Sequence, residues 1–92
     1  MRLVWTARGR GDLARIWLFL AEHDTEVADR VTREIQARSE RLADFPRIAP
    51  VVARNIRQWS IPKLGYLVTY CIADDHIRIV RVHHAREHRE TP

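Results

Sequence analysis

The stretch that decides the fold is Tyr66–His83, which reads YLVTYCIADDHIRIVRVH. On both sides of its central aspartate pair, large apolar or aromatic side chains alternate with other residues, which is the pattern of half-buried strands. The pair itself, Asp74–Asp75, favours a tight turn because aspartate readily bonds to its own backbone. The sequence therefore predicts an antiparallel hairpin with strands at residues 66–72 and 76–83.

Two further strands are predicted outside this hairpin. In residues 54–59 the side chains alternate with a period of two, as they do in a strand. A turn at 60–63 joins this segment to the hairpin. Residues 3–6 include β-branched and aromatic side chains and are soon followed by glycines, so they are expected to form a short first strand. We expect a small, mainly antiparallel sheet from these segments.

The segment between the first two predicted strands has helical periodicity. Apolar residues at 13, 16, 17 and 20 share one face of a helix at about residues 8–22. Asp12 is expected to cap this helix or to interact with its dipole. Asp24 is a plausible N-cap for a second helix, which should end at Phe45 because Pro46 follows.

These elements predict an α+β fold in the order β-α-α-β-β-β. Its N-terminal helical hairpin, at residues 8–45, should pack on one face of the sheet. The length of 92 residues suits one domain, 1–92. The only cysteine, Cys71, excludes an internal disulfide and is expected to serve packing.

The composition predicts a cytosolic protein with an anionic partner. The residues after Met1 do not resemble a secretion signal, and no apolar run approaches the roughly 20 residues that span a bilayer. The net charge of +4 arises entirely after residue 46, because residues 1–46 hold eight basic and eight acidic groups. A one-sided positive charge favours nucleic acid or an acidic protein segment as partner.

Three segments together resemble the RelE/ParE superfamily of bacterial type II toxins. They are TARGRGDLARIWLFLAEHD at 6–24, EVADRVTREIQARSERLADFPRI at 26–48 and GYLVTYCIADDHIRIVRVHHAR at 65–86. The long second helix and the phrase LADFPR, residues 42–47, look more like the ParE branch than the RelE branch. The resemblance implies a toxin that inhibits DNA gyrase, has no catalytic residues of its own and needs no cofactor.

The resemblance also implies a ParD-like antitoxin that holds the toxin inactive in a hetero-oligomer. We expect this partner to cover an exposed sheet edge and an apolar helix groove. Tryptophan and arginine are frequent interface anchors. The residues expected to contact the antitoxin are Trp17, Arg38, Arg41 and Trp59, although Trp5 and Trp17 are also expected in the core. The residues expected to contact the target are Arg54, Arg57, Arg81, Arg86 and Arg89.

The alternative is a RelE-like, ribosome-dependent messenger endoribonuclease. Cleavage without a metal needs a base, an acid and cations around one phosphate. The set for these roles would be Arg57, Arg81, His83 and Arg86, with Arg54, Arg78, His84 and His88 as further candidates. Tyr66 and Tyr70 are expected in the core instead of at such a site.

Two other possibilities remain open from the residues alone. His84 and His88 have the spacing of a helical metal-binding pair, but no third ligand is evident, so we predict no metal site. The chain could also be a toxin remnant, a structural module that binds the antitoxin and no longer harms the cell.

Overall fold

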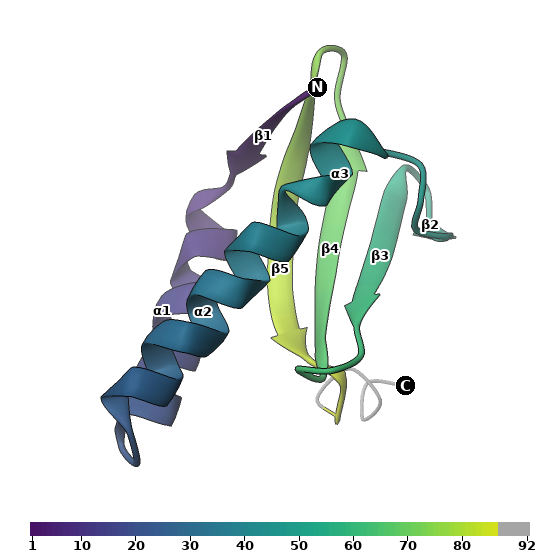
Figure 1. The fold of residues 1–92 in the computed structure, drawn as a ribbon. Coiled ribbons are helices and arrows are strands. Elements are labelled where there is room, and N and C mark those ends of the chain that lie inside the picture. Colours follow the sequence, from purple (N-terminus) through teal and green to yellow (C-terminus); the bar gives the residue numbers. More distant parts are fainter. Residues whose placement is uncertain (87–92) are drawn as a thin grey trace.

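The structure is a computed structural model that describes residues 1–86. It has the predicted α+β architecture, with the helices along one side of a five-stranded sheet (Figure 1). The elements in chain order are β1 (Arg2–Trp5), α1 (Ala7–Ala21), α2 (Thr25–Ser39), α3 (Arg41–Asp44), β2 (Val51–Ala53), β3 (Ile56–Ile61), β4 (Tyr66–Ile72) and β5 (His76–His84).

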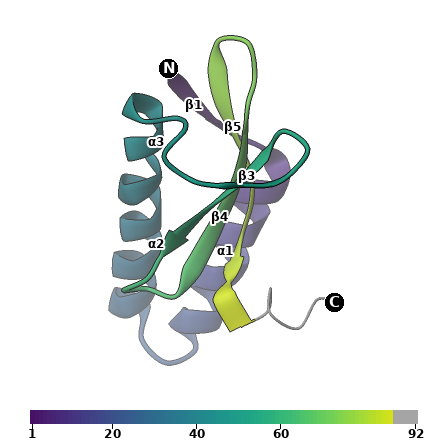
Figure 2. The same cartoon turned by 90° about the vertical axis from the view of Figure 1, so that its right-hand side faces the viewer.

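The strands are arranged in the order β1-β5-β4-β3-β2. The predicted hairpin is confirmed as β4 and β5, which pair antiparallel from Ile72↔Ile77 to Tyr66↔His84. β3 pairs antiparallel with β4, and β2 with β3. β1 pairs parallel with β5, with Leu3 opposite Ile77, so the first and last strands of the chain lie side by side (Figure 2).

A bulge in β5 changes which side chains face the helices. Thr69 pairs with Arg81 and Tyr70 pairs with Ile79, so Val80 is an extra residue with no partner on β4. Such an insertion reverses the alternation of side chains beyond it. Ile79 is therefore buried before the bulge and Val82 after it, while Arg81 emerges on the opposite face of the sheet.

The core lies between the helical layer and the sheet face that holds Tyr70. Ile35 from α2 and Leu42 from α3 are fully buried against this face. Both tyrosines of β4 belong to the core, as the alternation predicted. The other buried core residues are Ala49, Ile61, Tyr66, Val68, Ile77, Ile79 and Val82.

The start of α1 is fixed directly onto β5. The N-cap is Thr6, whose Oγ1 accepts a hydrogen bond of 3.0 Å from the Gly9 amide. The same hydroxyl lies 2.9 Å from the carbonyl oxygen of Ile79, to which it donates. Gly9 is buried, and a Cβ atom at this position would lie 3.0 Å from that same carbonyl oxygen. α1 therefore approaches the β5 backbone as closely as a glycine allows.

The structure corrects the predicted boundary of the second helix. It was expected to run unbroken to residue 45, but it ends at Ser39, and the short α3 follows after Glu40. The Ser39 hydroxyl is buried and donates to the Ile35 carbonyl at 2.7 Å, a back-bond that often bends helices.

The predicted strand at 54–59 is displaced. Arg54 and Asn55 form the turn between β2 and β3, and Asn55 has a φ of 53°, a left-handed conformation that asparagine tolerates. β3 consequently extends to Ile61, and the next turn occupies residues 62–65. β2 was not expected at all, because its three residues are exposed and give no pattern of burial.

Burial raises the pKa of Tyr70 above its ordinary value of 10.0, and this effect outweighs the opposing influences of a hydrogen bond with the Ala49 backbone and the Arg57 charge. The folded and unfolded chains both hold the phenol proton below pH 10. Above pH 10 the phenol of Tyr70 loses its proton more readily in the unfolded chain than in the folded one. The free energy of unfolding should therefore fall as the pH rises towards the pKa of Tyr70 in the folded protein. We expect urea unfolding followed by circular dichroism to show this alkaline loss.

The matched control for this prediction is Tyr70→Phe. It removes the hydrogen bond of 2.8 Å that the Tyr70 hydroxyl donates to the Pro46 carbonyl, at a cost of about 1 kcal/mol at neutral pH. Its stability should decline less steeply between pH 9.5 and 11 than that of the unchanged protein, a window taken as about the range over which a free tyrosine ionises. Parallel pH profiles for the two proteins would contradict the assignment.

Candidate functional site

A groove of about 750 Å³ lies between α1 and the C-terminal half of β5. β1 pairs with β5 only as far as Ile79. Beyond that residue α1 lies beside β5 in place of a neighbouring strand, and the groove lies between them. Two large apolar residues of α1 lie at the groove and are mostly exposed, Leu18 at 62% and Phe19 at 66%. The other lining residues are Asp12, Arg15, Ile16, Glu22, Tyr66, Arg81, Val82, His83, His84 and Arg86.

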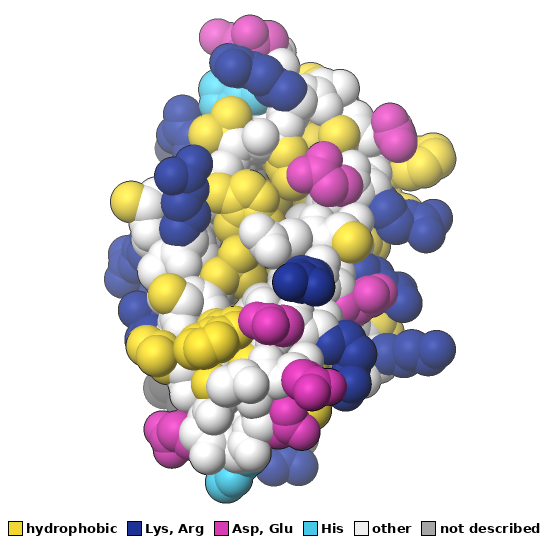
Figure 3. Space-filling model, turned by 60° about the vertical axis from the view of Figure 1, so that its left-hand side comes forward, with side chains coloured by type: hydrophobic (Ala, Val, Ile, Leu, Met, Phe, Trp, Pro, Cys, Tyr) yellow, Lys and Arg dark blue, Asp and Glu magenta, His cyan; other side chains and the backbone are white. Residues whose placement is uncertain are grey.

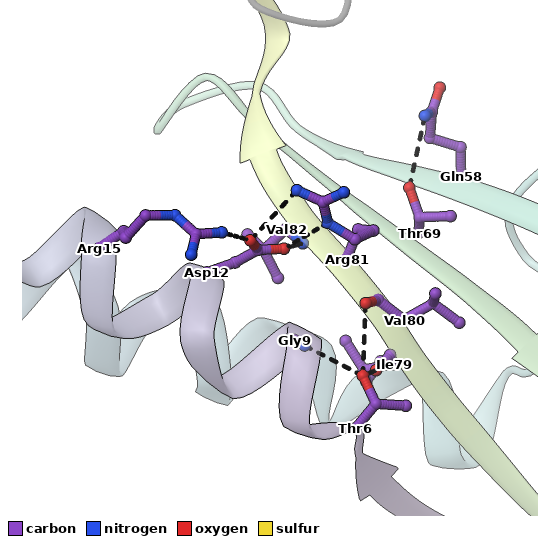
Figure 4. A network of polar contacts seen from close by, with 10 residues as sticks. All are labelled: Thr6, Gly9, Asp12, Arg15, Gln58, Thr69, Ile79, Val80, Arg81 and Val82. Atoms are coloured by element: carbon purple, nitrogen blue, oxygen red, sulfur yellow. Dashed lines mark hydrogen bonds and ion pairs between the residues drawn. The ribbon is translucent and has the colours of Figure 1, made fainter.

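One buried carboxylate organises the polar end of this groove (Figure 4). Asp12 is only 2% exposed and accepts hydrogen bonds from Arg81, at 2.9 Å from Nε and 3.3 Å from Nη2. It also accepts the Val82 backbone N–H at 2.8 Å and pairs with Arg15. A buried carboxylate needs several donors to offset its lost hydration, and this one has them. Asp12 thus links the middle of α1 to β5 just beyond the bulge.

The expectation that Asp12 caps its helix or serves the helix dipole is wrong. α1 begins at Ala7, so Asp12 lies beyond the first turn, and Thr6 is the cap. The sequence did carry a signal of the true role. Asp12 lies four residues before Ile16 and Gly9 four before Leu13, so an acid and a glycine occupy the same stripe as the apolar residues. An acid on a buried stripe indicates a partner inside the fold.

The two histidines at the end of β5 lie on different sides of the sheet. His84 is opposite Tyr66, and their rings meet edge to face with centroids 5.3 Å apart. Its Nδ1 also accepts the Arg86 backbone N–H at 3.1 Å. His83 is opposite Leu67 and therefore points towards the other face. Arg86 is exposed just beyond the strand, and His88 lies outside the described residues.

The residues that a ribonuclease would need are divided between the two sheet faces. Arg57 is opposite Tyr70 and so lies on the face that carries the core. Its Nη1 donates to the carbonyls of Ala49 at 2.7 Å and Arg47 at 3.3 Å, which gives it a role in holding the loop before β2. Arg81 is opposite Thr69, on the other face, as is His83.

The arginines expected to meet the target are likewise spread out. Arg54 is exposed in the turn at the β2 edge of the sheet, whereas Arg81 and Arg86 lie at the other end, beside α1. Arg78 is exposed on β5. Arg89 lies outside the described residues. No single surface of the described chain therefore brings this set together.

The residues expected to meet the antitoxin also occupy separate places. Trp17 is half-buried, and its Nε1 donates to Asp29 at 2.7 Å, so it joins α1 to α2. The expectation that Trp17 belongs to the core is therefore wrong. Arg38 bonds with Glu34 at 2.8 Å. Arg41 is exposed on α3. Trp59 is half-buried and packs against the core, as Trp5 does, from the face that also carries Val68.

Apolar and charged side chains share the face of the molecule that Figure 3 shows. Apolar side chains lie along its centre and lower left and basic side chains along both margins, with acidic side chains interspersed among them. Within residues 1–86 no three potential metal ligands lie close enough to hold an ion. No helix in that part of the chain is both long and apolar enough to cross a membrane.

Comparison with known proteins identifies relatives along nearly the whole chain. Two curated relatives come from Caulobacter vibrioides. Toxin RelE2 is 26% identical over 84 residues, covering 91% of this chain and 94% of the relative. Toxin RelE3 is 30% identical over 84 residues, covering 89% and 91%.

A solved structure shares the fold. It is described as a chromosomal ParDE toxin-antitoxin system from P. aeruginosa and superposes with a TM-score of 0.73 at 18% identity, covering 91% of this chain and 95% of the other. The family model of the ParE toxin of the type II toxin-antitoxin system, parDE, matches residues 3–89. The chain therefore belongs to the ParE toxin family of type II toxin-antitoxin systems, within the RelE/ParE superfamily.

Proposed function

We propose that this toxin inhibits growth by binding DNA gyrase and does not cleave RNA. The observation that carries the proposal is the separation of Arg57 from the rest of the ribonuclease set, because Arg57 lies on the core face of the sheet whereas Arg81, His83 and Arg86 line the groove beside α1. A metal-free ribonuclease must place its acid, base and cations around one phosphate. Arg57, which is bonded to the loop before β2, cannot join the other three residues around one phosphate.

The charges near β5 support the same conclusion. Arg81 already shares the buried carboxylate of Asp12, so part of its capacity to stabilise an anionic transition state is taken. The His84 ring is held by Tyr66 and by the backbone of Arg86. These contacts give Arg81 and His84 a role in stabilising the fold. The exposed cation at this end, Arg86, is a candidate contact with the target.

We further propose that a ParD-like antitoxin neutralises the toxin by covering apolar surface on the helical side. Leu18 and Phe19 form an exposed apolar rim at the groove beside α1. Apolar residues exposed side by side on a soluble protein commonly mark a partner surface. The groove follows α1 from Asp12 to Phe19 and would receive an amphipathic segment with side chains anchored in its apolar part.

The proposal is tested with purified toxin in a gyrase supercoiling assay. We expect supercoiling to be inhibited in proportion to toxin concentration and restored by antitoxin. His83→Ala should inhibit as strongly as the unchanged toxin, because His83 has no catalytic role in this proposal. Unchanged supercoiling at saturating toxin would contradict gyrase as the target.

The names of the two Caulobacter relatives make the ribonuclease reading worth a direct test. Primer extension on translated messenger RNA after toxin induction should show no new 5′ ends. New ends that disappear in the His83→Ala variant, with its fold and antitoxin binding intact, would favour the endoribonuclease instead. Normal growth on induction would indicate a toxin remnant.

A further inference from the structure

The outward side of α1 carries two exposed apolar residues between two charged ones. Arg15, Leu18, Phe19 and Glu22 have the spacing of one helix face, and all four are exposed. Within residues 1–86, Leu18 and Phe19 are more exposed than any other large apolar residue, at 62% and 66%. The opposite side of the helix packs against the core. An apolar pair this exposed on a helix face is typical of a contact surface.

The exposed charges along α1 are divided between its two ends. In the N-terminal half they are all basic, because the acid in that half, Asp12, is buried. From residue 22 to residue 26, at the C-terminal end and just beyond it, they are all acidic. The basic residues are Arg8, Arg10 and Arg15, and the acidic ones are Glu22, Asp24 and Glu26. The helix therefore presents a positive half, an apolar pair and a negative end.

This order of side chains is complementary to itself when it is reversed. A two-fold axis between Leu18 and Phe19 places Leu18 of one copy opposite Phe19 of the other. Arg15 precedes Leu18 by as many residues as Glu22 follows Phe19, so the same axis places Arg15 of each copy opposite Glu22 of the other. A parallel pairing would instead place Arg15 opposite Arg15, which is unfavourable. The charges thus favour a second copy with its helix running the opposite way.

The contact that α1 offers is small. The helix has 15 residues, which is about four turns. A standard stable interface buries about 800 Å² on each partner, and one helix face with two large apolar residues provides less than that. The pairing should therefore be weak and reversible, with a Kd on the order of 10 μM.

We propose that the free toxin forms a two-fold dimer in which α1 pairs antiparallel with α1 of a second copy. Leu18 and Phe19 form the apolar centre of the interface, and Arg15 pairs with Glu22 on each side of it. The inference goes beyond the proposed function and does not depend on the target. Because the antitoxin is proposed to cover the same apolar pair, the second copy and the antitoxin exclude each other at this surface.

Sedimentation equilibrium of the purified toxin without antitoxin measures this dimer. Phe19→Ser removes half of the apolar centre and should raise the Kd by about tenfold or more. The matched control is Phe45→Ser, which changes a phenylalanine that is 55% exposed just after α3. Its Kd should stay within about twofold of the unchanged value, because it lies outside the proposed interface.

Charge reversal tests the two-fold arrangement itself. Arg15→Glu places two acids opposite each other, and Glu22→Arg places two cations opposite each other. Each variant alone should therefore dimerise about tenfold more weakly than the unchanged toxin, or weaker still. An equal mixture of the two variants should recover the Kd to within about threefold of the unchanged value, because every contact then joins opposite charges.

Urea unfolding checks that each variant folds, which matters most for Arg15→Glu because Arg15 also pairs with Asp12. Three results would overturn the proposal. One is a toxin that stays monomeric at about tenfold the expected Kd. Another is a dimer that Phe45→Ser weakens and Phe19→Ser does not. The third is a mixture of the two folded charge variants that dimerises no better than either variant alone.

Gyrase inhibition gives a separate result. The dimer is measured without gyrase or antitoxin, so neither of these proteins affects it. A toxin that dimerises through α1 and leaves supercoiling unchanged would overturn the target alone. A toxin that inhibits gyrase and remains monomeric would overturn the dimer alone.

Discussion

Asp12→Ala is expected to destabilise the toxin by about 3 kcal/mol, at the lower end of the range for removing one partner of a buried ion pair. The substitution leaves the Val82 N–H without its acceptor in a buried position, and an orphaned buried donor costs about 1–3 kcal/mol. Arg81 loses its ion pair with Asp12 as well, but its side chain is 36% exposed and can turn towards water. The melting temperature should fall by on the order of 10 °C or more.

The matched control is Arg15→Ala on the same helix. Arg15 also pairs with Asp12, but its side chain is 66% exposed, so the pair is largely a surface one and its loss should cost less than about 1 kcal/mol. In a double-mutant cycle, Asp12→Ala and Arg81→Ala together should cost less than the sum of the single changes, because they share one contact. Equal effects of Asp12→Ala and Arg15→Ala on urea unfolding would show that Asp12 does not fasten α1 to β5.

Gly9→Ala and Gly11→Ala are expected to change stability in opposite directions. A Cβ atom on Gly9 would lie 3.0 Å from the Ile79 carbonyl oxygen, a backbone atom that cannot turn aside, so α1 must move away from β5. Overpacking of this kind costs about 1–3 kcal/mol. Within residues 1–86, a Cβ on Gly11 would meet only the end of the flexible Arg15 side chain, at 3.8 Å. Alanine there should stabilise the helix by about 0.5–1 kcal/mol.

Both glycines lie in α1, so the pair isolates the contact with β5 from helix propensity. Urea unfolding of the two variants, followed by circular dichroism, measures the difference. Gly9→Ala should also weaken the bonds of Asp12, since the same displacement draws it away from Val82. A stabilised Gly9→Ala variant would mean that α1 can shift at little cost, and the close approach would then have no structural importance.

Local patterns in the sequence predicted most of the hairpin and the helices. The alternation around Asp74–Asp75 located β4 and β5 because one face of each strand is buried and the other is not, which places Tyr70 in the core. The periodicity of residues 13–20 located α1 for the same reason. β2 escaped prediction because it buries neither face, so no alternation marks it.

The candidate site was predicted less well than the fold. The sequence singled out Arg57 and Arg81, but it could not place them on opposite faces, because the bulge at Val80 that sets the phase of β5 leaves no mark in the local pattern. Trp17 was expected in the core from its position on the apolar stripe, yet it bonds to Asp29 at the junction of the helices. Pairing across the sheet decides such positions, and a single segment does not encode it.

By itself the sequence determined the class of fold, the family and the one-sided basic charge, since all three depend on residue order and composition. The tertiary structure alone decided that β1 joins β5 in parallel, that Asp12 bonds to residues 69 and 70 positions away in the sequence, and that β2 is left open at the edge. The physical reason is the same in each case. These features depend on which distant segments meet, and that is settled by the burial of the whole core and not by any local preference.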